Sequence, residues 1–169
     1  QLQGDIREWM NRAGTDINSA PVPDWTLGNE ALSVAPAKVS VAVGTSQKVT
    51  LQVPVGKDVL KYWTPEHPNL YALLLSVKNQ KQTVDTKYER FGWREWTLQG
   101  TTQCLNGEPY ALHGDSWHFM GIPQMTRRYA WAWFTAIKGM NANAVRPHAQ
   151  VYPRFYLDMA DEMGICVLN

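Results

Sequence analysis

Arg146 and His148 stand where a short apolar segment, residues 143–145, runs into a loop. An arginine in that place usually has an anion to hold, because its guanidinium is always charged and presents five N–H donors. A second histidine, His118, follows Trp117 in a similar position after another predicted strand. Such side chains are suited to binding an anionic or polar ligand. The alternatives are an exposed ion pair for Arg146 and a loop-capping structural role for His118.

The other residues that could do chemistry favour structural interpretations. Asp161 and Glu162 are adjacent on a predicted helix and therefore do not face one site, so we assign the pair to structure. Cys104 and Cys166 lie too far apart for a redox motif or a zinc knuckle, and we expect two buried free thiols. The spacing of these residues therefore predicts no metal site.

Tryptophans offer a second kind of binding surface, because aromatic faces suit the apolar faces of sugar rings. Trp117, in the loop after a predicted strand, is the candidate for contact with a sugar. Trp133 falls at helical spacing, which predicts a core position. Trp63 comes just before Pro65 and Pro68 and is expected to pack with them at the edge of the sandwich.

The second half of the chain alternates strands and helices. Apolar residues three or four apart predict a helix over residues 125–140, and a second helix is expected over 153–164 with Gly164 as its end. Short strands are predicted roughly at 109–114, 143–146 and 165–168. The order βαβαβ implies parallel strands joined by crossovers.

The first half has the texture of antiparallel β structure. Strand patterns occupy residues 39–44 and 48–55 as a hairpin, and they recur over 70–80 and 82–92. Strands continue from residue 94 to 114, where Asn106 and Gly107 supply a two-residue hairpin turn. Strands at this density without helices between them indicate an antiparallel sandwich. Residues 1–37 are expected to be irregular, with a helix-like patch at residues 5–11.

Composition and charge exclude several classes of partner. The chain has 169 residues, 44% of them hydrophobic, with eight tryptophans, which is typical of a globular protein. Sixteen basic and fifteen acidic residues nearly cancel, so neither nucleic acid nor an anionic membrane is an expected partner. No apolar run approaches the roughly 20 residues of a membrane helix. Because the first residue is Gln1, and the predicted parallel sheet is small, we expect the chain to be part of a longer protein.

Four motifs, in order along the chain, resemble those of family 2 glycoside hydrolases, the group of β-galactosidases, β-glucuronidases and β-mannosidases. The motifs are YWTPEHPNLYALLLSV (62–77), DTKYERFGWRE (85–95), CLNGEPYALHGDSWHF (104–119) and NAVRPHAQVYPRFYLDMADEMGICVL (143–168). The resemblance implies that residues 1–99 form an immunoglobulin-like β-sandwich, with 1–37 irregular. Residues 100–169 would then be the incomplete start of a TIM (β/α)8 barrel.

The resemblance also implies roles for three of the candidate site residues. Arg146 matches an arginine beside the nucleophilic carboxylate, and His118 matches a histidine that reaches the sugar pocket. The family pattern is Arg-x-x-His, whereas His148 follows Arg146 by two residues, so His148 sits one residue out of register or makes another contact. Trp117 is kept as a substrate contact. Retaining hydrolysis uses two carboxylates about 5–5.5 Å apart, and in this family both glutamates come from later barrel strands.

The implied activity is a retaining glycosidase for terminal β-linked sugars, β-galactosides ahead of β-glucuronides, with the chain alone inactive. No cofactor is required, because the reaction runs on carboxylates. Two alternatives stay open: a non-catalytic carbohydrate-binding module, and an interaction module that recruits a partner or a second copy through exposed barrel edges. The compartment stays open as well, although a periplasmic or secreted polysaccharide-degrading enzyme would fit.

Overall fold

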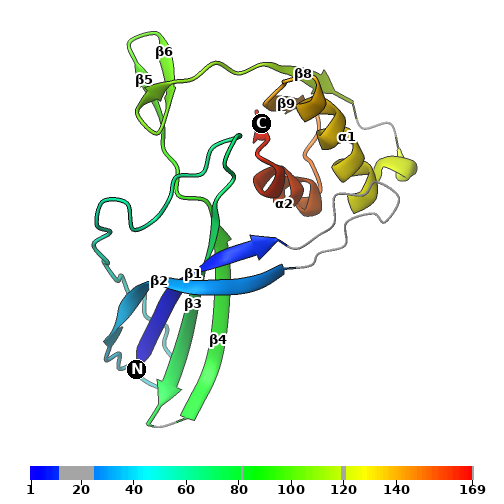
Figure 1. Cartoon of the computed structure of the whole chain (residues 1–169). Coiled ribbons are helices and arrows are strands. Elements are labelled where there is room, and N and C mark those ends of the chain that lie inside the picture. The colour runs from blue at the N-terminus through cyan, green and yellow to red at the C-terminus, as the bar shows by residue number, and fades with distance from the viewer. Residues whose placement is uncertain (12–24, 81, 119–120, 169) are drawn as a thin grey trace.

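The computed structural model describes residues 1–11, 25–80, 82–118 and 121–168. Figure 1 shows a long twisted antiparallel sheet at one end and a small parallel sheet with two helices at the other. A short hairpin lies beside the parallel sheet. The amino terminus is at the far end of the antiparallel sheet, and the carboxyl terminus lies within the α/β part.

Four strands build the antiparallel sheet, in the spatial order β2-β1-β3-β4. They are β1 (Leu2–Asn11), β2 (Trp25–Ala37), β3 (Leu70–Asn79) and β4 (Gln82–Phe91). β3 and β4 confirm two predicted strands. The prediction for residues 1–37 is wrong, because β1 lies there and pairs with both β2 and β3, and residues 5–11 are strand and not helix. The antiparallel β structure expected of this half is therefore present.

The hairpin predicted at residues 39–44 and 48–55 is also wrong, since neither segment is a strand. Leu51, Val53 and Val55 are half-buried, whereas the residues between them are exposed. Val55 and Leu60 pack on one face of the sheet around Ile6 and Tyr71. The β-branched pattern thus marks a segment that covers the sheet, although it forms no hydrogen-bonded ladder of its own.

Three short strands form a second antiparallel sheet, in the order β5 (Trp96–Gln99), β6 (Thr102–Leu105) and β7 (Glu108–Pro109). Asn106 and Gly107 join the last two, with φ of 55° and 87°. Positive φ at both positions is what the favoured two-residue turn requires, so the predicted turn is confirmed.

The α/β part has a parallel sheet in the order β10-β9-β8. Its elements follow along the chain as β8 (Gly114–Trp117), the 3-10 helix η2 (Ile122–Gln124), α1 (Arg127–Gly139), β9 (Ala144–Pro147), α2 (Arg154–Met163) and β10 (Cys166–Val167). Both helices, β9 and β10 confirm predictions. β8 begins later than the predicted 109–114, since the parallel ladder starts where Gly114 pairs with Ala144. A Cβ on Gly114 would lie 2.1 Å from the Ala144 carbonyl oxygen, so only glycine permits this approach.

Helix ends follow local chemistry. Thr126 caps α1 by accepting a hydrogen bond from the Tyr129 amide at 3.1 Å. α2 ends at Gly164, which has a left-handed conformation with φ of 72°, as predicted. The core between the helices and the sheet is aromatic, with Phe134 and Tyr156 fully buried.

Gly164→Ala should lower the free energy of unfolding by about 2 kcal/mol or more, since a side chain is strained at positive φ. The new Cβ would also lie 2.2 Å from the Pro65 carbonyl oxygen. Gly139→Ala is the matched control, because it lies in α1 with no atom within 4 Å of an added Cβ, and alanine there should stabilise by up to about 1 kcal/mol. Urea denaturation followed by circular dichroism measures both; equal effects would contradict the argument.

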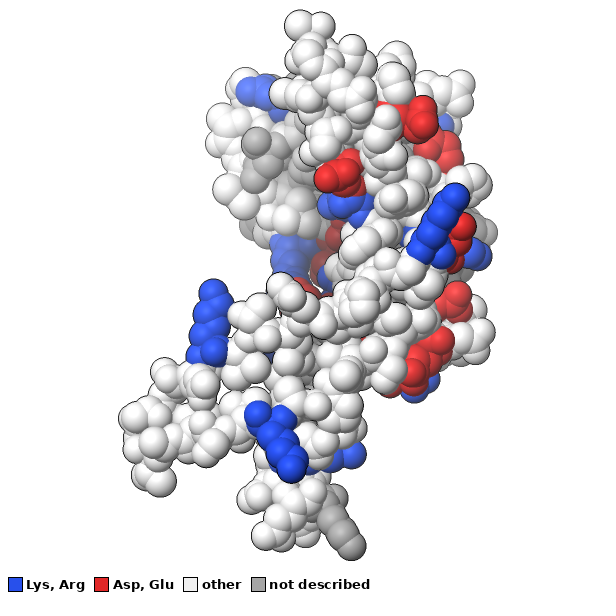
Figure 2. Space-filling model, turned by 90° about the vertical axis from the view of Figure 1, so that its left-hand side faces the viewer, with Lys and Arg blue, Asp and Glu red and all other residues white. Residues whose placement is uncertain are grey.

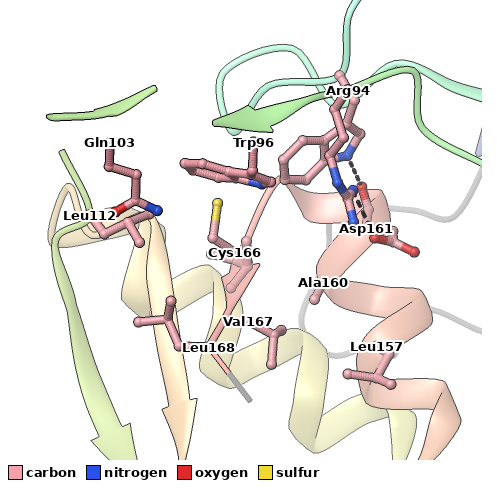
Figure 3. Close-up of a pocket in the computed structure, with 12 residues that line it drawn as sticks. Arg94, Trp96, Gln103, Leu112, Leu157, Ala160, Asp161, Cys166, Val167 and Leu168 are labelled. Carbon is pink, nitrogen blue, oxygen red and sulfur yellow. Dashed lines mark hydrogen bonds and ion pairs between the residues drawn. The ribbon is translucent and has the colours of Figure 1, made fainter. Parts of the chain in front are cut away.

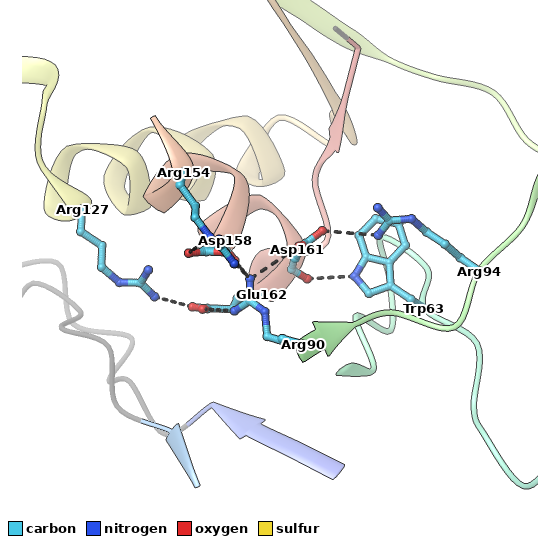
Figure 4. A network of polar contacts seen from close by, with 8 residues as sticks. All are labelled: Trp63, Arg90, Arg94, Arg127, Arg154, Asp158, Asp161 and Glu162. Atoms are coloured by element: carbon cyan, nitrogen blue, oxygen red, sulfur yellow. Dashed lines mark hydrogen bonds and ion pairs between the residues drawn. The ribbon is translucent and has the colours of Figure 1, made fainter. Parts of the chain in front are cut away.

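A network of ion pairs ties the antiparallel sheet to α2 (Figure 4). Arg90 of β4 donates to Glu162 at 2.6 Å and to Asp158 at 3.0 Å, and it lies 3.5 Å from Asp161. Arg127 at the start of α1 donates to the other oxygen of Glu162. The Glu162 side chain is only 7% exposed and Arg90 only 11%. The assignment of Asp161 and Glu162 to structure is therefore confirmed.

Trp63 completes this junction. Its indole N–H donates to the Asp161 carbonyl oxygen at 2.8 Å, and its side chain is 1% exposed. The Arg94 guanidinium lies 4.5 Å from the Trp63 ring centroid and also pairs with Asp161. The packing role expected for Trp63 is confirmed, since the residue joins the loop before β3 to α2.

Candidate functional site

The carboxyl ends of β8 and β9 bring the predicted polar residues to one edge of the parallel sheet. Ser116 pairs with Arg146 and Trp117 with Pro147 in the parallel register. The His148 amide donates to the Trp117 carbonyl oxygen at 2.9 Å, which extends the contact past the strand ends. In α/β folds, ligands bind outside the carboxyl ends of parallel strands. This edge is therefore the candidate site.

Arg146 is exposed and only weakly engaged. Its Nη1 lies 3.5 Å from the Ser116 hydroxyl and 3.5 Å from His148 Nδ1, both at the limit of a hydrogen bond. Within the described ranges, no carboxylate forms an ion pair with Arg146, whereas the arginines of the α2 network each do. The guanidinium therefore has N–H donors available for an acceptor on a bound ligand.

Two histidines lie beside this arginine. The rings of His118 and His148 are 4.2 Å apart between centroids and tilted by 30°. Both side chains are exposed, as is Arg146. Three of the four predicted site residues thus form one cluster of hydrogen-bond donors that includes a charged guanidinium, which suits a ligand with carboxylate or hydroxyl oxygens.

Trp117 lies on the opposite side of the sheet from Ser116, as strand alternation requires. Its ring stacks on Trp133 at 4.5 Å and packs against Tyr152 and Tyr156 in the aromatic core. Contact with a sugar stays a prediction for Trp117, and the packing already accounts for one face of its ring. Trp133, predicted in the core, is half-buried at the side of the same cluster.

Ser116 is the member of the site that the sequence does not single out. Its hydroxyl lies beside Arg146 because the two residues are register partners. A shallow cavity of about 280 Å³ lies over this face of the sheet, lined in part by Ser116, Arg146 and Leu168. Spacing alone could not reveal Ser116, because its proximity depends on how β8 and β9 align.

A larger cavity of about 500 Å³ lies between the β5–β6 hairpin and β10, as Figure 3 shows. Trp96 and Gln103 line it from the hairpin, and Leu112 and Cys166 from the α/β part. Cys166 pairs with Ala144, the first residue of β9, so this cavity lies at the amino ends of the strands. Leu112 and Leu168 line both this cavity and the smaller one beside Arg146.

The Cys166 thiol should react slowly with iodoacetamide at pH 8. Burial raises its pKa to about 11 from an ordinary 9.0, which makes the thiolate about a hundredfold scarcer below pH 9. The raised pKa also makes the stability of the fold depend on pH. The contribution of the protonated Cys166 thiol to the free energy of unfolding is fully present below pH 9 and is lost as the pH rises from 9 to 11. Intact-mass kinetics on the Cys104→Ser variant checks the rate, with free cysteine as the reference; equal rates would contradict the prediction.

Charge and composition at the surface add two observations. Figure 2 shows basic and acidic side chains interspersed on the face in view, without a continuous patch of one sign. Among the described residues, no helix is long and apolar enough to cross a lipid bilayer. No group of three or more His, Cys, Asp or Glu side chains in those same residues is placed to hold a metal ion.

Comparison with known proteins agrees with these features. The sequence model "Glycosyl hydrolases family 2" matches residues 23–94. A putative β-glucuronidase of Formosa agariphila is 32% identical over 148 residues, which cover 83% of this chain and 14% of the relative. A β-galactosidase of Priestia megaterium is 27% identical over 80% of this chain and 13% of the relative.

Solved structures extend the likeness to nearly the whole chain. A crystal structure of a Bacteroides uniformis β-glucuronidase matches 98% of this chain and 18% of its own, with a TM-score of 0.69 and 25% identity. The chain thus spans about a seventh of the length of the curated relatives that it matches. Family model, relatives and structures agree: the chain belongs to glycosyl hydrolase family 2.

Proposed function

We propose that this chain is part of a retaining β-glycosidase, in which the Arg146 cluster forms part of the sugar-binding site. The observation that carries the proposal is an exposed arginine at the carboxyl end of a parallel strand, with weak contacts to its neighbours, in a chain of this family. The relatives named β-glucuronidase and β-galactosidase are glycosidases by name, which supports the same class of activity for the longer protein.

The α/β part, residues 100–169, would be the opening of a TIM barrel, and residues 1–99 would belong to the preceding sandwich. The parallel order β10-β9-β8 with intervening helices supports this division. Active sites of such barrels lie at the carboxyl ends of the strands. That is the end at which His118, Arg146 and His148 gather.

Each residue of the cluster then has a role that its chemistry supports. Arg146 would lie beside the nucleophilic carboxylate and favour its ionised form, because an opposite charge within about 4–6 Å stabilises the anion. His118 and His148 would donate to sugar hydroxyls. The acid/base and the nucleophile would come from sequence outside this chain, as the family resemblance implies, so the reaction needs the longer protein.

The substrate class is terminal β-linked sugars. We keep β-galactosides first and β-glucuronides second, and the names of the relatives include both. The site as described has an arginine and two histidines, which accept either a neutral hydroxyl or a sugar carboxylate. Self-association through the outer strands β8 and β10 stays a prediction, which size-exclusion chromatography of the chain would check.

The test is hydrolysis of a panel of nitrophenyl β-glycosides by two proteins, this chain and the longer protein that contains it. We expect turnover only by the longer protein, with the β-anomer as the first product by NMR, as retention requires. The panel contains galactoside, glucuronide, glucoside and mannoside. Turnover by the chain alone, turnover by neither protein, or an α-anomer as first product would overturn the proposal.

A further inference from the structure

We propose that the antiparallel sheet carries an accessory carbohydrate-binding surface, remote from the Arg146 cluster. The surface is the outer face of the sheet, opposite the face covered by Leu60 and Tyr71. Its centre is a row of register partners that runs across all four strands, Ser33, Asp5, Leu74 and Tyr88. This inference goes beyond the proposed function and does not rest on it.

Two cavities lie along the outer face, and Tyr88 lines both. One has a volume of about 480 Å³ and is bordered by Asp5, Arg7 and Glu30. The other, of about 220 Å³, lies toward α2 and is bordered by Trp9, Trp25 and Arg127 among others. Pockets that bind small molecules usually have volumes of about 300–1,000 Å³, a range that includes the first cavity, whereas the second is smaller. Because Tyr88 joins the two, a ligand of more than one ring can span them.

Each cavity contains a buried polar atom without a partner. Asp5 accepts from Arg7 through Oδ2 at 3.1 Å, but its Oδ1 is buried and has no hydrogen-bond donor among the described residues. Trp9 and Arg127 line the second cavity, and the Trp9 indole Nε1 and the Arg127 Nε are buried donors without an acceptor in the part of the chain that the structure describes. A buried polar atom that is left unpaired is unfavourable. A ligand that donates a hydrogen bond at one end and accepts hydrogen bonds at the other would provide partners for all three atoms.

Exposed aromatic rings lie beside these atoms. Trp25 stacks on Trp9 with centroids 4.0 Å apart, and Tyr88 lies 5.7 Å from Trp25. The Arg90 guanidinium lies 5.5 Å from the Trp9 ring centroid, so Trp9 is held between two neighbours. Trp25 and Tyr88 are 38% and 50% exposed. Their rings therefore offer a platform that costs little conformational entropy on binding.

These features together specify a neutral oligosaccharide of pyranose rings. A sugar hydroxyl both donates and accepts, which matches Asp5 Oδ1 at one cavity and the Trp9 and Arg127 donors at the other. Its apolar ring face suits Tyr88 and Trp25. Nucleic acid is disfavoured, because Asp5 and Glu30 neutralise Arg7 at this surface.

The test is titration of the chain with tetrasaccharides of β-linked glucose, galactose and mannose, followed by NMR and calorimetry. We expect at least one to bind and to shift the Trp9 indole N–H resonance, because that proton gains an acceptor. Tyr88→Ala should weaken binding about tenfold through the lost ring contact. Tyr62→Ala is the matched control: its side chain is 54% exposed and lines a different cavity, so the affinity should not change.

The indole resonance keeps the test decisive if a variant folds poorly, since it needs only the unchanged chain. Three results would overturn the inference. They are no binding by any tetrasaccharide, binding without a shift of the Trp9 indole proton, and an equal loss of affinity in the Tyr62 and Tyr88 variants. Because none of these readouts uses hydrolysis, their failure is distinguishable from failure of the proposed glycosidase function.

Discussion

Glu162→Ala should lower the free energy of unfolding by about 3–5 kcal/mol, because it removes the carboxylate between two largely buried arginines. Arg90 and Arg127 each bond to a different oxygen of Glu162, whose side chain is 7% exposed. Loss of the carboxylate leaves both guanidinium groups without this partner in a region of low dielectric. Chemical denaturation of the chain, followed by tryptophan fluorescence and circular dichroism, measures the change.

Glu108→Ala is the matched control for Glu162. Glu108 is an exposed residue of β7, and its loss should change stability by no more than about 0.5 kcal/mol. Glu162→Gln keeps the shape and one acceptor while it removes the charge, so its effect should lie between the two. Equal stability of the Glu108 and Glu162 alanine variants would show that the network does not hold the two sheets together.

Arg146→Ala in the longer protein should lower kcat by about a hundredfold or more, with little change in thermal stability. The two effects separate because the contacts of Arg146 to Ser116 and His148 are long, at 3.5 Å, and contribute little to folding. The charge, in contrast, would act on the nucleophilic carboxylate of the proposed reaction. Steady-state kinetics on the best nitrophenyl glycoside, together with a melting curve, measures both.

The conservative variant and a control sharpen this prediction. Arg146→Lys keeps the charge but loses the planar pair of donors, so it should restore part of the rate. Arg128→Ala removes an exposed arginine of α1 and should leave kcat unchanged. A kcat for Arg146→Ala equal to that of the Arg128 variant would remove Arg146 from the site.

The parts of the fold that local chemistry specifies are predictable. α1 shows a 3.6-residue apolar period and a threonine cap, and α2 ends at a glycine with positive φ. The turn at Asn106 and Gly107 needs only its two residues. Each of these signals lies within a few positions of the feature that it predicts, so one sequence is enough.

The parts that depend on partners are not predictable in this way. β1 is irregular in its pairing to β2, with register shifts near Gly4 and Arg7, and its residues show no clean alternation. Residues 39–55 have the opposite property, since a β-branched pattern lies there without a ladder. A segment forms a strand only when another strand pairs with it. The residue pattern of one segment does not show whether such a partner strand lies beside it.

The candidate site shows the same division. Motifs identify Arg146, His118 and His148, and the structure brings them together. Ser116 joins them only through its register with Arg146. Substrate contact stays a prediction for Trp117, whose ring the pleat directs toward the helices. Residue types are thus readable from the sequence, but the side of the sheet requires the register.

The long separation within the Arg90–Glu162 pair has a consequence for synthesis on the ribosome. Glu162 follows Arg90 by 72 positions, which at about 5–20 residues per second corresponds to roughly 4–15 s of translation. During that interval the nascent antiparallel sheet presents Arg90 without its carboxylates. All four strands of the sheet can therefore pair before α2 has been synthesised. Folding of the sheet and docking of α2 onto Arg90 are thus separate steps in time.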